Sequence, residues 1–277
     1  MRAAAVQLNS TADKPRNLET AERLVREATD DGAELIGLPE KWNVLGNREA
    51  LLDGAETIDG PTITTCREWA RELGIHLLAG SFAERVPERE KLSNTSVLID
   101  PDGEIVATYR KIHMFDVDVG GVEYRESASQ EPGTEIVIGD AGGVPVGMTV
   151  CYDVRFPELY RILAVRGARV ITVPAAFTLH TGKDHWEVLL RARAIENQVF
   201  VLAPGQIGEA PPHYHSYGRS MILDPWGVVL ATAPDEECFV AAELDFELQD
   251  RIRDKLPSLA NRQPTAYLWP ELEEARA

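Results

Sequence analysis

The chain has 277 residues, of which 45 are acidic and 28 are basic, so its formal net charge is −17. This charge repels phosphate backbones and anionic lipid headgroups, which argues against nucleic acid and membranes as partners. It indicates either an ordinary solvated acidic surface or adaptation to a salt-rich cytosol, and charge alone does not separate the two.

The cysteine count and the lengths of the apolar runs indicate the cellular compartment and argue against a membrane-spanning helix. Three cysteines, Cys66, Cys151 and Cys238, form no paired framework of the kind that small secreted domains use. No apolar run approaches the roughly 20 residues that a membrane-spanning helix needs. We therefore expect a soluble cytoplasmic protein in a reducing compartment.

Strand and helix patterns alternate in the first third of the chain. The expected order is strand 1–8, helix 17–32, strand 33–39, helix 61–74 and strand 75–82. We expect Asn17 to cap the first helix and Gly32 to end it. Pro61 suits the first turn of the second helix, and Gly74 suits its end.

The same order of elements returns in the second half: strand 143–150, helix 157–167, strand 168–176, helix 184–198 and strand 199–205. The segments 97–109 and 221–233 each read as two strands joined by Asp-Pro-x-Gly, which suits a type I turn. Convergence on a common turn is the alternative explanation, but the matched order predicts an internal repeat. No linker-like stretch intervenes, so we expect one α/β domain over 1–277, with two sheets covered by helices on their outer faces.

Cys151 stands where the apolar run 143–150 gives way to the polar turn of "VCYDVRFPE". A buried structural cysteine is the ordinary interpretation, and Cys66 and Cys238 fit it. Cys151 instead follows a strand and precedes a helix start at Pro157, at the sheet edge where open α/β folds bind ligands. A thiol near a helix start tends toward a lower pKa, so Cys151 is a candidate nucleophile.

Two further charged residues follow apolar strands. Glu40 ends "GLPE" and Lys111 follows the first hairpin in "YRKIHMFD". Each alone could be an ordinary surface charge. An acid, an ammonium group and a thiol at matching strand ends could together polarise a carbonyl group and move a proton.

In these segments the sequence resembles the nitrilase superfamily of carbon–nitrogen hydrolases, over nearly the full chain. "GLPE", "YRKIHMFD" and "VCYDVRFPE" have the order and spacing of that family's Glu-Lys-Cys triad. "EYRESASQEPG" resembles the segment that carries a second glutamate, which aligns with Glu126, although Glu123 and Glu131 lie nearby. "DHWEVLLRARAIENQVFV" and "YGRSMILDPWG" resemble the amidase branch that includes omega-amidase and deaminated glutathione amidase.

The resemblance implies a fold and an assembly. The implied fold is a four-layer α-β-β-α sandwich that dimerises by packing one sandwich on another. The helix 184–198 would contribute to that contact, so we expect a homodimer or a higher homo-oligomer. The individual run 206–215 would reshape the mouth of the pocket.

The resemblance also implies a mechanism on a small-molecule amide. Cys151 would attack the carbonyl, Glu40 would transfer the protons, and Lys111 with the backbone N–H of Tyr152 would face the oxyanion. No metal or organic cofactor is required. In the family, the residue that matches Glu126 orients the lysine or the substrate. The residue that matches Arg155 holds a substrate carboxylate.

Several alternatives stay open. The same triad serves nitrilases and N-carbamoyl amidohydrolases, and the scaffold could belong to a non-catalytic binding protein. A papain-like Cys/His hydrolase is a further alternative, but none of the six histidines lies in a recognisable partner motif. His113 is better explained as support beside Lys111. The histidines of "HYH" at 213–215 are more typical of a loop than of a metal site. For Arg155, the alternative is a surface pair with Asp153 or Glu158.

Overall fold

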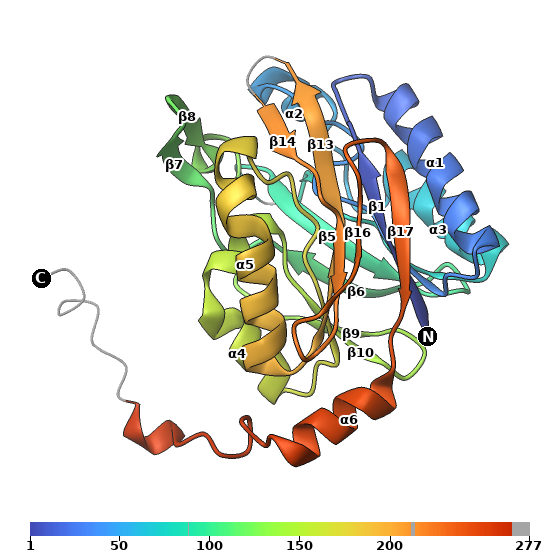
Figure 1. The fold of residues 1–277 in the computed structure, drawn as a ribbon. Helices are drawn as coiled ribbons and strands as arrows, with labels where there is room; N and C mark the ends of the chain where they lie inside the picture. The colour runs from blue at the N-terminus through green and yellow to red at the C-terminus, as the bar shows by residue number, and fades with distance from the viewer. Residues whose placement is uncertain (88, 212–213, 268–277) are drawn as a thin grey trace, which may run out of the picture.

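Two large β-sheets organise the protein (Figure 1). The computed structural model describes residues 1–267 except 88, 212 and 213. The larger sheet contains β1 (Arg2–Leu8), β2 (Leu35–Gly37), β3 (His76–Leu78), β4 (Phe82–Glu84), β5 (Ser93–Ile99), β6 (Ile105–Arg110), β13 (Gly205–Ala210), β14 (Tyr214–Tyr217) and β17 (Cys238–Glu243). The smaller sheet contains β9 (Ile138–Asp140), β10 (Pro145–Met148), β11 (Val170–Thr172), β12 (Phe200–Ala203), β15 (Met221–Leu223) and β16 (Val229–Thr232).

The remaining described elements are helices and one separate hairpin. The hairpin pairs β7 (Asp116–Val119) with β8 (Val122–Arg125). The α-helices are α1 (Lys14–Asp30), α2 (Arg48–Asp53), α3 (Pro61–Leu73), α4 (Pro157–Val165), α5 (Leu179–Asn197) and α6 (Phe246–Lys255). Short 3-10 helices are η1 (Glu126–Ala128), η2 (Cys151–Arg155) and η3 (Pro264–Ala266). Among the described residues, no helix is both long and apolar enough to cross a membrane.

The two sheets repeat one topology, as the sequence predicts. In the larger sheet β1, β2 and β3 are parallel neighbours, and β3 pairs antiparallel with the β5–β6 hairpin. In the smaller sheet β10, β11 and β12 are parallel neighbours, and β12 pairs antiparallel with the β15–β16 hairpin. Because parallel neighbours need a crossover, α1 and α3 connect the first set and α4 and α5 the second.

The two hairpins match in their turn hydrogen bonds. The N–H of Gly103 donates to the carbonyl of Asp100, and the N–H of Gly227 donates to that of Asp224, each at 2.9 Å. Both glycines have positive φ, 76° and 86°, which a residue with a Cβ adopts only with strain. Both hairpins also shift register at corresponding positions, next to Ile99 and next to Leu223. This agreement in detail supports an internal repeat over chance convergence.

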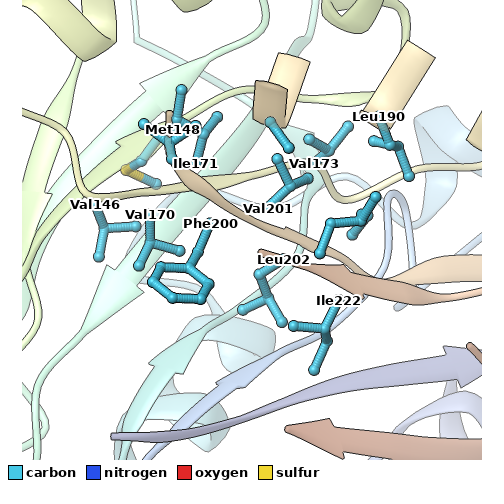
Figure 2. Close-up of a cluster of buried hydrophobic side chains, with 14 of the residues drawn as sticks. Val146, Met148, Val170, Ile171, Val173, Leu190, Phe200, Val201, Leu202 and Ile222 are labelled. Carbon is cyan, nitrogen blue, oxygen red and sulfur yellow. The ribbon is translucent and has the colours of Figure 1, made fainter. Parts of the chain in front are cut away.

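Alternating side chains of β1 connect two hydrophobic layers. Ala4 and Val6 pack in the cluster that joins the larger sheet to α1 and α3. Ala3 and Ala5, on the opposite face of the strand, join the cluster that contains β10, β11, β12 and α5. Figure 2 shows this second cluster, with labelled side chains from β10, β11, β12, β15 and α5.

The helices cover the outer faces of the paired sheets. In Figure 1, α1 and α3 lie on one side of the molecule, and α4 and α5 lie on the opposite side. The architecture is the expected four-layer α-β-β-α sandwich.

Three local predictions were wrong. Asp13, not Asn17, caps α1, because Pro15 already suits the first turn and the Asn17 amide instead bonds the Thr11 and Asn43 carbonyls. The predicted strand 75–82 is divided into β3 and β4 at Gly80, whose φ is +53°. Helix α5 begins five residues before 184, at Leu179, because Thr178 caps it.

Candidate active site

Four charged side chains meet beyond the ends of β2 and β6. Lys111 Nζ lies 3.1 Å from Glu40 Oε1 and 2.7 Å from Glu126 Oε2. Lys41 Nζ lies 2.9 Å from the other oxygen of Glu126. Asn94 Nδ2 donates to both carboxylates, at 2.8 Å to Glu40 and 3.3 Å to Glu126. All five side chains are buried, so two carboxylates and two ammonium groups balance one another away from solvent.

Cys151 faces this charged cluster from the opposite sheet. It follows β10 and opens η2 with a φ of +48°, a left-handed conformation that costs a residue with a side chain about 1–3 kcal/mol. Its N–H donates to the Pro174 carbonyl at 2.8 Å, which fixes the turn to the segment after β11. Its thiol lies close enough to the Glu40 carboxylate for each group to shift the pKa of the other.

The electrostatics correct the expectation of a low cysteine pKa. Burial, together with the negative charge of Glu40, raises the pKa of Cys151 well above its ordinary value, and Lys111 offsets this only in part. Burial also raises the pKa of Glu40, but Lys111 and Lys41 outweigh it and hold the net pKa below its usual value. At neutral pH the resting pair is therefore a neutral thiol beside an ionised carboxylate.

Glu126 and Lys111 are also held in their ionised forms. Burial raises the pKa of Glu126, but Lys111 and Lys41 reverse this and bring it well below its usual value. Burial lowers the pKa of Lys111, but the attraction of Glu126 and Glu40 raises it well above its ordinary value. Lys111 therefore presents a permanent positive charge between two carboxylates.

Asp153 anchors the turn that carries Cys151. This fully buried carboxylate accepts hydrogen bonds from the Tyr109 hydroxyl at 2.7 Å and from the Val150 N–H at 2.8 Å on Oδ2. Its Oδ1 accepts from the His113 N–H at 3.2 Å and lies 2.7 Å from His113 Nδ1. His113 thus supports the cysteine turn through Asp153, rather than Lys111 as the sequence suggested.

A cavity of about 280 Å³ opens in front of the cysteine and the charged cluster. Its walls come from the loop and helix around α2, from the β7–β8 hairpin and from the segment between β11 and α5. The charged side chains that line it are Lys41, Arg48, Lys111, Arg125, Glu40, Glu123 and Glu126. These four cations and three anions give the cavity lining a formal charge of +1, in a chain of charge −17.

Tyr152 lies at one wall of this cavity, and Arg155 packs behind that wall without being among the residues that line it. Tyr152 lines it, and its N–H is in the first turn of η2, where helical N–H groups have no partner within the helix. The guanidinium carbon of Arg155 lies 5.2 Å from the ring centre of Phe177 and 5.9 Å from that of Tyr152, so it stacks against the wall. Among the described residues Arg155 forms no ion pair with Asp153 or Glu158, and its polar neighbour is His185 at 3.4 Å.

The structure also distinguishes among the other glutamates, cysteines and histidines that the sequence analysis considered. Of the three candidate glutamates near 126, Glu126 contacts Lys111, while Glu123 pairs with Arg125 and Glu131 with Arg89. The three cysteines are free, and Cys66 is fully buried as expected, whereas Cys238 is only half-buried. Of the histidines in 213–215, His213 is outside the described residues, and His215 lies 3.8 Å from Glu209.

Sequence reasoning missed Lys41 and Asn94. A lysine directly after a glutamate has the pattern of an exposed loop charge, and an asparagine within a strand carries no motif. The available signal for Lys41 was its place between Glu40 and Trp42, because Trp42 is fully buried and brings its neighbours inward. Asn94 is visible only once β5 is placed beside β4 and β6.

Comparisons of sequence and of fold relate the chain to known proteins. The carbon–nitrogen hydrolase family model matches residues 2–254. The chain is 44% identical to deaminated glutathione amidase from Synechocystis sp. over 94% of this chain and 97% of that protein. It is 37% identical to omega-amidase NIT2 from Bos taurus, over 96% of each. The structure of Saccharomyces cerevisiae Nit3, a member of branch 10 of the nitrilase superfamily, superposes with a TM-score of 0.86 at 31% identity, covering 95% of this chain and 96% of that one.

The match over most of the chain and these full-length relatives show that the protein belongs to the carbon–nitrogen hydrolase family of the nitrilase superfamily.

Proposed function

We propose that the protein hydrolyses a small carboxylated amide to a carboxylate and ammonia through an acyl-enzyme on Cys151. The observation that carries this proposal is the placement of the Cys151 thiol beside a buried, ionised Glu40, where both line a cavity. A thiol with a raised pKa needs a base within hydrogen-bond reach, and Glu40 occupies that place. The names of the amidase relatives support the amide as the substrate class.

In the acylation half of the reaction, Glu40 accepts the thiol proton as Sγ bonds to the amide carbon. The carbonyl π electrons move to oxygen and give a tetrahedral oxyanion. When the C–N bond breaks, Glu40 returns the proton to the nitrogen, and ammonia leaves a thioester on Cys151. The carboxylate is again ionised and ready for the second half.

In the deacylation half, water replaces ammonia. Glu40 takes a proton from the water as its oxygen bonds to the thioester carbon. The C–S bond then breaks, the acid product forms, and the proton returns to the sulfur. The enzyme recovers the thiol that it began with.

Lys111 and the backbone N–H of Tyr152 serve the oxyanion of both halves. Lys111 is held between Glu40 and Glu126, so its positive charge is oriented before substrate arrives. Loss of one such preorganised donor typically costs about 3 kcal/mol of transition-state stabilisation. The role of Glu126 is to fix Lys111.

The carboxylate of the substrate is assigned to the side of the cavity near Arg155. Arginine suits this role because its planar fork meets a carboxylate with two parallel hydrogen bonds. Its stacking on Phe177 and Tyr152 places the guanidinium beside the cavity wall without an ion-pair partner among the described residues. The formal charge of +1 on the cavity lining favours an anionic substrate within a strongly acidic protein.

An ammonia-release screen tests the proposal directly. The panel pairs ω-amides of dicarboxylic acids with their neutral analogues, and adds carbamoyl amino acids and simple nitriles. We expect a higher kcat/KM for the carboxylated amide than for its neutral twin, and no turnover by Cys151→Ser. Equal kcat/KM values for a carboxylated amide and its neutral analogue would refute a carboxylated substrate. A higher kcat/KM for a nitrile or a carbamoyl compound would refute an amide substrate.

We also propose that the protein is a homodimer through the outer face of α5. Val188 and Ile195 are large apolar side chains that are 67% and 49% exposed, and the exposed Trp226 is on the turn that contacts α5 at Ile195. A helix that packed only on its own sheet would expose few such groups. Light scattering at micromolar concentration should give twice the monomer mass, and Val188→Glu should give the monomer. A monomeric parent protein would contradict this assignment.

A further inference from the structure

Lys41 is a buried lysine in an unusual backbone conformation beside Glu40. Its φ is +51°, and its N–H donates to Ser81 Oγ at 3.1 Å. The left-handed conformation costs a side-chain-bearing residue about 1–3 kcal/mol, and such strain is concentrated at functional sites. The residue is 6% exposed and lines the cavity. The strained turn therefore directs Glu40 and Lys41 into the same buried cluster.

The carboxylate of Glu126 is shared between the two lysines. Its Oε2 accepts from Lys111 Nζ at 2.7 Å and from the Phe115 N–H at 2.9 Å. Its Oε1 accepts from Lys41 Nζ at 2.9 Å and, more weakly, from Asn94 at 3.3 Å. Each oxygen thus holds one ammonium group, and the carboxylate plane is fixed from both sides.

We propose that Lys41 is a positioning residue of this active centre: it holds Oε1 of Glu126 so that Oε2 stays directed at Lys111, and it balances the second negative charge beside Cys151. The inference rests on the proposed amide hydrolysis and adds a residue to it. Without Lys41, Oε1 would keep only neutral amide donors, Gln130 at 3.1 Å and Asn94 at 3.3 Å, and no positive charge. The cluster would then hold two carboxylates and one ammonium group, an excess of negative charge where thiolate and oxyanion must form.

The proposal has a pH signature because Lys41 also lies close to the proposed base. The titratable and charged groups that face Glu40 are Lys111 from the end of β6, Lys41 from its own loop, Glu126 from η1 and the Cys151 thiol from η2. Lys41 favours the ionised form of Glu40, so its removal raises the Glu40 pKa. Because Glu40 must be ionised to act, the acid limb of the pH profile should then move to higher pH.

The experiment compares Lys41→Met with the parent enzyme, using Lys14→Met as the matched control. Lys14 is less buried than Lys41 but is likewise paired with a glutamate, Glu56, and it does not line the cavity. We expect Lys41→Met to lower kcat about tenfold with little change in KM, and to move the acid limb of kcat/KM up by about one pH unit. Lys14→Met should leave both unchanged. An acid limb that stays in place in a folded Lys41→Met variant would overturn the proposal.

Two further measurements test the role of Lys41 independently of Lys41→Met turnover. Lys41→Arg keeps the charge and can still pair with Oε1 of Glu126, so the acid limb of its pH profile should match that of the parent. This test remains available even if Lys41→Met does not fold. An acid limb displaced in Lys41→Arg would overturn the proposal. The pH dependence of Cys151 alkylation by iodoacetamide reports Glu40 without any substrate. An inactive parent enzyme would refute amide hydrolysis, whereas identical alkylation profiles of the parent and a folded Lys41→Met would refute the role of Lys41 alone.

Discussion

Replacement of Asp153 by asparagine should destabilise the protein far more than its small change in volume suggests. Both oxygens of this buried carboxylate accept a backbone N–H, from Val150 on Oδ2 and from His113 on Oδ1. An asparagine has one acceptor oxygen, so either orientation turns its NH₂ group toward one of these two N–H groups. The Tyr109 hydroxyl and the His113 ring can exchange donor and acceptor roles, but a backbone N–H cannot.

The magnitude follows from this donor–donor contact. A hydrogen bond to a charged group contributes about 1.5–3 kcal/mol, and a buried donor without an acceptor costs about 1–3 kcal/mol. We therefore expect Asp153→Asn to lower the free energy of unfolding by about 3–5 kcal/mol. Because the same turn carries Cys151, kcat should fall as well.

Urea unfolding tests this value against a matched variant. Asp224 is also a buried aspartate, but its two backbone donors, Trp226 at 2.9 Å and Val228 at 2.8 Å, both bond Oδ1. Asparagine can place its single oxygen there, so Asp224→Asn should cost no more than about 1 kcal/mol. A difference between the two variants of less than about 1 kcal/mol, at equal m-values, would refute the reasoning.

Three other outcomes are expected. Arg155→Lys should raise KM for a carboxylated amide at least about tenfold, because the charge stays but the bidentate geometry is lost, and an unchanged KM would remove Arg155 from the site. Gly80→Ala should reduce both the thermal midpoint and the activity, because a Cβ there would meet the carbonyl of Pro39, the neighbour of Glu40; a variant as stable as the parent would contradict this close approach. The folded-state pKa of Glu126 lies below the ordinary 4.5, so its ionisation stabilises the fold above that pH and the gain is lost as pH falls. The urea midpoint of Glu126→Gln should therefore fall less than that of the parent on acidification, and parallel curves would contradict it.

The architecture could be predicted from sequence because its signals are local. Helical spacing in α1 reflects its one buried face, the apolar run of β1 reflects burial on both faces, and Asp-Pro-x-Gly specifies the same turn twice. Two of the three wrong predictions involve contacts between distant segments. Asn17 bonds the carbonyl of Asn43, and Gly80 lies against Pro39, and neither approach is visible in a local pattern.

The candidate site was predictable only in part for the same reason. Glu40, Lys111 and Cys151 each follow a strand, and their motifs identify them in order along the chain. Lys41 and Asn94 belong to the site because both donate to Glu126, which is distant in sequence from both. The pKa of Cys151 was predicted in the wrong direction because a helix start indicates stabilisation of thiolate, whereas burial beside Glu40 opposes it more strongly.

The covalent step on Cys151 is the central claim, and rapid acid quench with mass spectrometry tests it most directly. The parent enzyme is mixed with a carboxylated amide, quenched within the first turnover and digested. The account predicts a mass increase equal to the substrate minus ammonia, located on the peptide that contains Cys151 and absent from Cys151→Ser. An adduct on another residue, or undiminished turnover by Cys151→Ser, would contradict it.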